Sequence, residues 1–250
     1  MRVARRSHRL VAALAALTLA APACGGDDGS SSSDGAGTAS TLRISGSTTV
    51  NPVAADAAEV LRDQGMRITV DSQGGSAGGI AQLGAGQVEI AMSSKEVSDD
   101  DRAKFPSVDF RATEIGQDAV GIIARKEVVD GGVSSLDRQQ LMALFEGRVK
   151  NWSELGGPDL EVFVYDKEPG RGTREVLDKY LYGPDGAAPP PPQSDSFAIV
   201  GGNEETRTKL LSTTGSVGPL SSSFITGYPK LAALAVDGVA PTPDAVKSST

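Results

Sequence analysis

The chain has 250 residues, with 24 lysines and arginines against 32 aspartates and glutamates, and a formal net charge of −8. Removal of residues 1–23 takes away four arginines and no acid, which leaves a net charge of −12. This acidic balance argues against nucleic acid as a partner, because binding to a phosphate backbone needs a basic surface. The only histidine is His8 and the only cysteine is Cys24, so the sequence beyond them excludes a Ser-His-Asp triad and metal sites built on His or Cys.

The first residues are typical of a targeting segment. Four arginines precede an apolar run over 11–21, which is too short to span a membrane as a stable helix. Small residues then lead to Cys24, as in lipoprotein signals, where the cysteine is lipidated and becomes the first residue. The alternative is a plain secretory signal with an incidental cysteine. We expect a signal peptide over 1–23 and a lipid anchor on Cys24 that holds the chain on the extracytoplasmic face of the cell membrane.

Residues 24–40 are rich in Gly, Ser, Asp, Ala and Thr, which predicts a flexible, solvated tether. Strand-like and helix-like stretches alternate after it. In the first half, the patterns predict strands over 41–45, 67–71, 88–92, 108–115 and 119–125, and helices over 52–64 and 80–86. The run over 119–125 is almost continuously apolar, which predicts burial on both faces. In the second half, they predict helices over 136–145, 173–181 and 203–211, and strands over 161–165 and 231–236.

Three glycine-rich segments lie directly before predicted helices. They are Gly46–Val50, Gly74–Gly79 and Pro169–Glu175, and each places small hydroxyl side chains beside glycine. Glycine lets backbone N–H groups approach a ligand closely, and a helix N-terminus presents unpaired N–H donors to an anion. Each segment alone is typical of an ordinary strand-to-helix turn. Together they predict a cage for a small oxyanion.

The second of these segments also matches G-x-S-x-G, the nucleophile elbow of hydrolases. No histidine follows it and no S-x-x-K pattern occurs, so a serine hydrolase is the least favoured function. The sequence also lacks a G-x-x-x-x-G-K-[ST] loop for nucleotides. Asp99–Asp101 lacks the ligand spacing of a calcium loop. We therefore expect no metal, no cofactor and no enzymatic activity.

Further short motifs follow one another in a fixed order. They are Ser45–Val50, Gly74–Ile80, Glu89–Glu96, Gln117–Val120, Phe145–Gly147, Asn151–Pro158, Gly172–Arg174 and Val236–Thr242. This ordered set resembles the PstS-type phosphate-binding lipoproteins of bacterial phosphate ABC transporters, a family of periplasmic binding proteins. The resemblance extends from about Ser45 to Pro243.

The alternation of strands and helices predicts an α/β fold with mostly parallel sheets, and a break near residues 115–119 favours two lobes. The resemblance implies the two-lobed periplasmic-binding-protein fold of type II, with the ligand between lobes joined by a hinge. We expect 41–117 together with about 215–250 to form the first lobe. We expect about 118–214 to form the second.

The resemblance also implies the ligand residues. The first lobe would offer Thr48, Thr49, Ser76 and Ser94. The second would offer Lys167, Arg171, Gly172 and Thr173. Asp118 would lie at the crossing between lobes, where its carboxylate would accept the proton of hydrogen phosphate and repel sulfate, which has no proton to donate.

The third glycine-rich turn departs from the family pattern. The family usually has an arginine four residues before a Ser-Gly-Thr. This chain has Lys167 at the arginine position and Arg171 at the serine position. A lysine cannot make the forked contact that an arginine makes with an oxyanion. Arg171 either reaches inward and restores that contact, which we favour, or points to solvent.

The predicted function is an extracytoplasmic solute receptor that binds inorganic phosphate and delivers it to the permease subunits of an ABC transporter. The expected partners are therefore phosphate, the permease and the membrane, and we expect a monomer. Two alternatives remain. One is a degenerate family member that acts as a surface sensor or interaction protein, and the other is a receptor for another oxyanion.

Overall fold

The computed structural model describes residues 40–242 and 244–245. They lie in a compact unit that spans Ala39–Thr250. The signal peptide expected over 1–23, the lipidated Cys24 and the tether up to residue 39 lie outside the described residues. Within the described part, none of the helices has the length and hydropathy of a membrane span.

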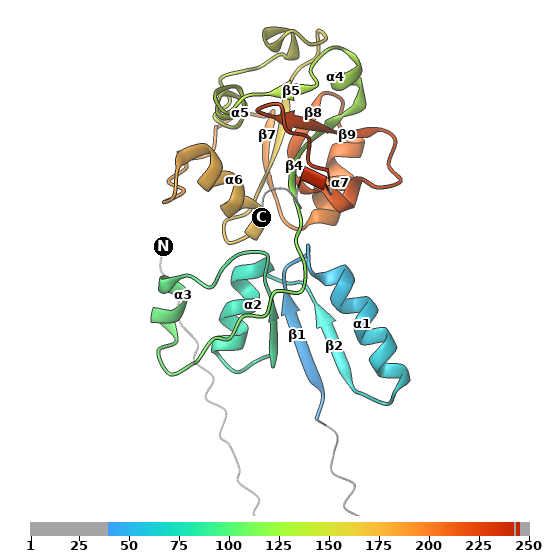
Figure 1. The fold of residues 1–250 in the computed structure, drawn as a ribbon. Helices are drawn as coiled ribbons and strands as arrows, with labels where there is room; N and C mark the ends of the chain where they lie inside the picture. The colour runs from blue at the N-terminus through green and yellow to red at the C-terminus, as the bar shows by residue number, and fades with distance from the viewer. Residues whose placement is uncertain (1–39, 243, 246–250) are drawn as a thin grey trace, which may run out of the picture. The chain divides into compact units, whose positions relative to one another are not determined.

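The first lobe contains a three-stranded parallel sheet (Figure 1). Strand β1 (Leu42–Gly46) lies between β2 (Ile68–Asp71) and β3 (Ile90–Met92). Helix α1 (Asn51–Asp63) joins β1 to β2, α2 (Gly75–Gly84) joins β2 to β3, and α3 (Asp99–Lys104) follows β3. Because the three strands run in the same direction, their carboxyl ends meet at one edge of the sheet.

The second lobe contains a six-stranded mixed sheet in the order β5-β9-β4-β8-β6-β7. Its strands are β4 (Val120–Arg125), β5 (Ser135–Leu136), β6 (Phe163–Lys167), β7 (Phe197–Val200), β8 (Ser216–Ser221) and β9 (Leu231–Val236). Its helices are α4 (Lys126–Asp130), α5 (Arg138–Phe145), α6 (Gly172–Tyr182) and α7 (Asn203–Ser212), with 3-10 turns η1 (Trp152–Leu155) and η2 (Ser222–Ile225). Strand β6 is parallel to β7 and β8, whereas β4 is antiparallel to β8 and β9. The carboxyl ends of β6, β7 and β8 therefore lie at the edge where β4 begins.

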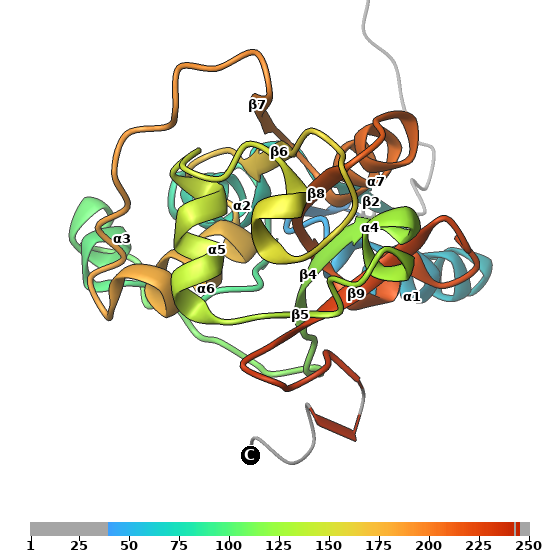
Figure 2. The same ribbon diagram turned by 90° about the horizontal axis from the view of Figure 1, so that it is seen from above.

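Strand β4 confirms the prediction of a strand buried on both faces. Ile122 and Ala124 belong to one hydrophobic cluster, and Ile123 between them belongs to another. Successive side chains of a strand point to opposite faces of the sheet, so the two clusters lie on opposite faces. Figure 2 shows α5 and α6 on one side of the sheet and α7 on the other.

The later part of the chain corrects the predicted lobe boundaries. Residues from about 215 onward were expected to belong to the first lobe, but β8 and β9 are strands of the second. They pair with β4 on its two sides. Neither β7 nor β8 was predicted as a strand, and the β4–β8 pairing joins segments far apart in the chain. No local pattern specifies such a pairing.

The strand predicted over 108–115 does not form. Phe110 is buried there and packs edge-on against Phe105, with ring centroids 6.3 Å apart, while residues 111–118 are exposed. A strand needs a neighbour for its backbone hydrogen bonds. Among the described residues this segment pairs with no strand. It is instead the connection that runs from the first lobe to the second (Figure 1).

Candidate functional site

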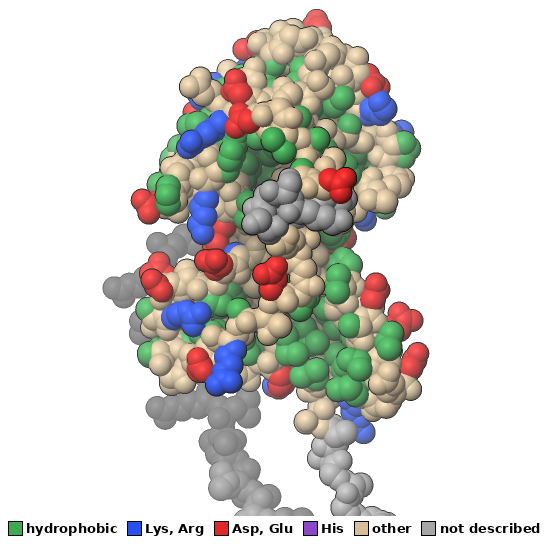
Figure 3. Space-filling view, in the orientation of Figure 1, with side chains coloured by type: hydrophobic (Ala, Val, Ile, Leu, Met, Phe, Trp, Pro, Cys, Tyr) green, Lys and Arg blue, Asp and Glu red, His purple; other side chains and the backbone are tan. Residues whose placement is uncertain are grey.

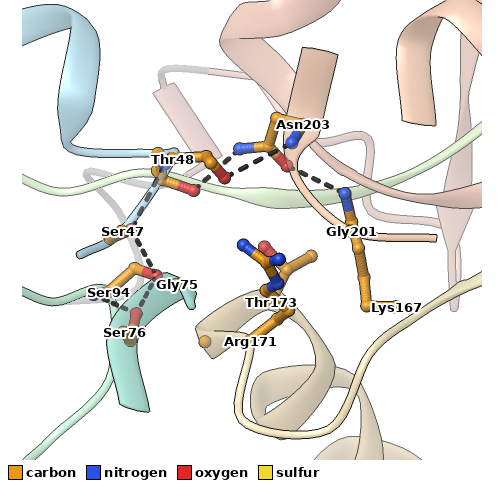
Figure 4. Close-up of a pocket in the computed structure, with 12 residues that line it drawn as sticks. Ser47, Thr48, Gly75, Ser76, Ser94, Lys167, Arg171, Thr173, Gly201 and Asn203 are labelled. Carbon is orange, nitrogen blue, oxygen red and sulfur yellow. Dashed lines mark hydrogen bonds between the residues drawn. The ribbon is translucent and has the colours of Figure 1, made fainter. Parts of the chain in front are cut away.

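A small polar cavity lies where turns from both lobes meet (Figure 4). The turns after β1, β2 and β3 line it from the first lobe, and the turns after β6 and β7 line it from the second. Helices α2, α6 and α7 begin beside it, and helix N-termini favour anions. The lining residues are Ser47, Thr48, Thr49, Gly75, Ser76, Ser94, Lys167, Arg171, Gly172, Thr173, Gly201 and Asn203.

Serine hydroxyls form a connected network on the first-lobe wall. Ser47 Oγ donates to Ser94 Oγ at 3.0 Å, and the Oγ atoms of Ser94 and Ser76 lie 3.2 Å apart. Ser76 Oγ also accepts from the backbone N–H of Ser94 at 3.1 Å. Whichever hydroxyl donates in the Ser76–Ser94 bond, the other keeps its hydrogen free. This wall can therefore offer a hydroxyl donor to an anion.

Arg171 brings a positive charge to the second-lobe wall. It precedes α6, and its Nε and Nη2 lie 3.1 and 2.6 Å from Oε2 of Glu168. Its side chain is 15% exposed and lines the cavity, as Figure 4 shows. The inward orientation is thus the observed one. Among the described residues, Nη1 has no hydrogen-bond partner, so it remains available to an anion beside the buried Thr173.

Lys167 lies at the end of β6 and is almost fully buried, with 1% of its surface exposed. Its ammonium donates to the carbonyl of Gly202 and to Oδ1 of Asn203, both at 3.2 Å, and to Oγ1 of Thr206. An ammonium has three hydrogens, so the protein itself uses all three. Lys167 therefore lines the cavity as a buried charge and has no free donor for a ligand.

Asp118 does not line this cavity. It precedes β4, which lies two strands from β6 in the sheet, and it faces a separate, mainly apolar cavity formed with β4 and β9. Although Asp118 is exposed overall, partial desolvation of its carboxyl by the surrounding chain raises the pKa, and a hydrogen bond with Ser221 at the end of β8 opposes that rise. The expected contact between Asp118 and the anion therefore has no support in this arrangement, because the strand order keeps β4 away from the cavity.

The other predicted ligand residues converge on one cavity. They are Thr48, Thr49, Ser76, Ser94, Lys167, Arg171, Gly172 and Thr173. Four further lining residues were not predicted: Ser47, Gly75, Gly201 and Asn203. Ser47 and Gly75 lie inside the predicted turns. Gly201-Gly202-Asn203 repeats the same pattern of glycine between a strand and a helix, a signal that could have identified it.

Direct contacts join the two lobes around the cavity. The N–H of Ala77 donates to the carbonyl of Gly170 at 3.1 Å. Lys95 Nζ lies 3.1 Å from Glu175 Oε1 on α6 and 2.8 Å from Asp101 Oδ2 on α3. The cavity has a volume of about 10 Å³, room for roughly one water-sized group. A small anion in this cavity would therefore contact both walls at once.

The overall charge of the chain opposes an anion. The net charge is −8, and Figure 3 shows acidic side chains spread over both lobes on the face in view. Salt screens such charges over about 8–10 Å, whereas hydrogen-bond donors act at contact. The cavity must therefore act through aimed hydroxyls, helix N-termini and the guanidinium of Arg171.

The fold and the cavity together define a class of protein in which two α/β lobes hold a small polar ligand between them. A family model described as a PBP superfamily domain matches residues 31–247. The phosphate-binding protein PstS of Bacillus subtilis (strain 168) is 32% identical over 240 residues, which cover 93% of this chain and 75% of that protein. PstS of Staphylococcus aureus (strain USA300) is 28% identical over 167 residues, which cover 64% of this chain and 50% of that protein.

Solved structures show the same fold. A substrate-binding protein from Clostridium perfringens, solved with bound phosphate, superposes with a TM-score of 0.72 at 26% identity, covering 84% of this chain and 81% of that one. An ABC-type phosphate transport receptor from Vibrio cholerae gives a TM-score of 0.62 at 23% identity, covering 83% and 81%. The chain belongs to the PBP superfamily and, within it, to the PstS family of phosphate-binding proteins.

Proposed function

We propose that this chain is an extracytoplasmic receptor that binds inorganic phosphate between its lobes and delivers it to the permease of an ABC transporter. The observation that carries the proposal is the convergence of donors from separate turns, above all Ser76, Thr173 and Arg171, on one cavity. The names of the relatives support it, since the Bacillus subtilis protein is a phosphate-binding protein and the Clostridium perfringens structure contains phosphate.

The mechanism that fits this geometry is hinge closure. Phosphate would first meet one wall and then bond to both, so it would stabilise the arrangement in which the lobes touch. The serine network would donate from the first lobe, and Arg171 with the N-terminus of α6 would donate from the second. Every step is binding and release, and the mechanism requires no covalent chemistry on the ligand.

Calorimetric titration of the full chain with inorganic phosphate tests this function. The proposal predicts saturable binding of one phosphate per chain. Absence of binding at millimolar phosphate would overturn it.

A lipid anchor at Cys24, a monomeric state and docking on permease subunits complete the proposal. A Cys24→Ser variant is expected to leave the membrane fraction, because its signal would no longer direct lipidation. Retention of that variant on the membrane, at the level of the parent chain, would contradict the anchor.

A second candidate is a receptor for a fully ionised oxyanion such as sulfate. No carboxylate is among the cavity-lining residues of the described chain, so the proton-dependent selection expected of Asp118 is missing there. Competition between sulfate and phosphate in the same titration separates the two candidates. The other alternative, a degenerate surface sensor, was based on the altered third turn, and the inward position of Arg171 weakens it.

The contribution of Lys167 to phosphate affinity is expected to fall as pH rises through 7. Burial is the main cause that lowers the pKa of Lys167 to about 7, and the nearby charge of Arg171 is the second. Three carboxylates oppose this shift: Glu204, Glu205 and Asp166. A nearby cation favours a bound anion, and this cation is present below that pKa and lost above it. Titrations of the parent chain and of Lys167→Met between about pH 6 and about pH 8.5 should give an affinity ratio that shrinks with rising pH. Taking the ratio cancels the ionisation of phosphate itself, and a pH-independent ratio would contradict the prediction.

The Glu175→Gln variant is expected to bind phosphate about two- to fivefold more weakly at low salt, since a partly exposed ion pair contributes roughly 0.5–1 kcal/mol. Glu175 pairs across the lobes with Lys95, so its loss favours the open form. The difference should shrink as salt screens the pair. Glu59→Gln, at an exposed position on α1, is the matched control. An unchanged affinity for Glu175→Gln at low salt would show that the pair does not support closure.

A further inference from the structure

Asn203 is a buried polar residue that joins the cation on one side of the cavity to the threonines on the other. It begins α7 in the second lobe and is 1% exposed. Its Nδ2 donates to Thr49 Oγ1 at 3.0 Å, and its backbone N–H donates to Thr48 Oγ1 at 3.3 Å. Both threonines belong to the first lobe. We propose that Asn203, oriented by Lys167, is a positioning residue that turns the hydroxyls of Thr48 and Thr49 into donors for the bound anion, an inference that depends on the proposed function.

Lys167 fixes which way the carboxamide of Asn203 points. An ammonium only donates, so it faces the oxygen of the amide, and Nζ lies 3.2 Å from Oδ1. The amide nitrogen then faces Thr49. Lys167 has no hydrogen left for a ligand, so beyond the attraction of its charge it acts on the anion through Asn203.

Each of the two threonine hydroxyls keeps one hydrogen that it can donate. Each Oγ1 accepts a hydrogen bond from Asn203, and a hydroxyl that accepts still has its own hydrogen to donate. Both residues line the cavity, and Figure 4 shows the bonds from Asn203 reaching across to the Thr48 turn. An oxyanion binds to hydrogen-bond donors, so the contacts with Asn203 orient these two hydroxyls for binding it.

The same bonds exist only when the lobes meet. Asn203 lies on α7 of the second lobe, and the two threonines lie in the turn after β1 of the first. In the open form the amide would lose Thr49, and the threonine hydroxyls would lose their orientation. Closure and the preparation of the anion site are thus one event.

A double-mutant cycle tests the proposal by calorimetric titration of the full chain with inorganic phosphate. Asn203→Ala and Thr49→Val are each expected to lower the affinity by about tenfold, the effect of one lost hydrogen bond. If Asn203 acts through Thr49, the double variant should bind within about twofold of Thr49→Val alone. If the fold-losses of phosphate affinity in the two single variants multiply in the double variant, the two residues act independently and the inference is overturned.

Thr206→Val is the matched control. Thr206 also accepts from Lys167 but contacts neither threonine, so this variant disturbs the lysine without touching the Asn203–Thr49 bond. Its thermal midpoint is expected to fall while its phosphate affinity stays within about twofold. Because Thr206→Val keeps the Lys167–Asn203 bond, an affinity loss equal to that of Asn203→Ala would show that any disturbance of this buried cluster weakens binding, and would overturn the inference. If the parent chain does not bind phosphate, the proposed function is overturned as well. If the parent binds and the losses in the double-mutant cycle multiply, only the role of Asn203 is overturned.

Discussion

Replacement of Arg171 by alanine is expected to lower the affinity for phosphate about 100-fold, because a charge-assisted hydrogen bond contributes about 1.5–3 kcal/mol and the buried charge adds to it. Arg171 lines the cavity with one guanidinium nitrogen free among the described residues. Its loss would also leave the carboxylate of Glu168 without its ion-pair partner. Titration of the variant with phosphate measures the effect.

Two further variants make that result specific. Arg171→Lys keeps the charge but loses the forked geometry, so it should fall between the parent chain and Arg171→Ala. Arg111→Ala removes an arginine that is 87% exposed and does not line the cavity, and it should bind like the parent chain. An affinity for Arg171→Ala within about threefold of the parent would mean that Arg171 does not contact the ligand.

Replacement of Gly172 by alanine is expected to lower phosphate affinity at least tenfold, since the clash that it creates costs more than about 1.4 kcal/mol. A Cβ at this position would lie 2.2 Å from Ser94 Oγ and 2.9 Å from the Ser94 carbonyl carbon and oxygen. Ser94 belongs to the first lobe and Gly172 begins α6 in the second. The added methyl group would therefore hold the lobes apart at the point where phosphate must bridge them.

The Gly172→Ala variant should fold normally, because alanine has a higher helix propensity than glycine. Its thermal midpoint without ligand is therefore expected to equal or exceed that of the parent. Gly116→Ala is the matched control, since a Cβ there would meet no atom of the described chain within 4 Å. Equal phosphate affinity for the two variants would show that closure does not require contact between Gly172 and Ser94.

The features that the sequence predicts correctly are the local ones. A glycine-rich turn between a strand and a helix has a signature in adjacent residues, so the Gly74–Gly79 turn could be recognised, although α2 begins at Gly75 and not at the predicted residue 80. The continuous apolar run that forms β4 was also predicted, because burial on both faces leaves a local signature. Parallel strands then bring such turns to one edge, which explains why so many of the predicted ligand residues share a cavity.

The features that it misses depend on strand order. The family resemblance implied that Asp118 contacts the anion, but Asp118 precedes β4, which lies between β8 and β9, and it is not among the residues that line the cavity. The prediction for residues beyond 215 failed for the same reason. The glycines before Asn203 gave a local signal that was overlooked, but its contacts with Lys167 and with the threonines of the other lobe have no local signature in the sequence.

Donors from both lobes are proposed to hold one phosphate between them. A crystal structure of the chain grown with phosphate would show whether they do. We expect tetrahedral density within hydrogen-bond distance of Ser76, Thr173 and Arg171. Phosphate bound at another place, with these three side chains turned away from it, would rule out this mode of binding.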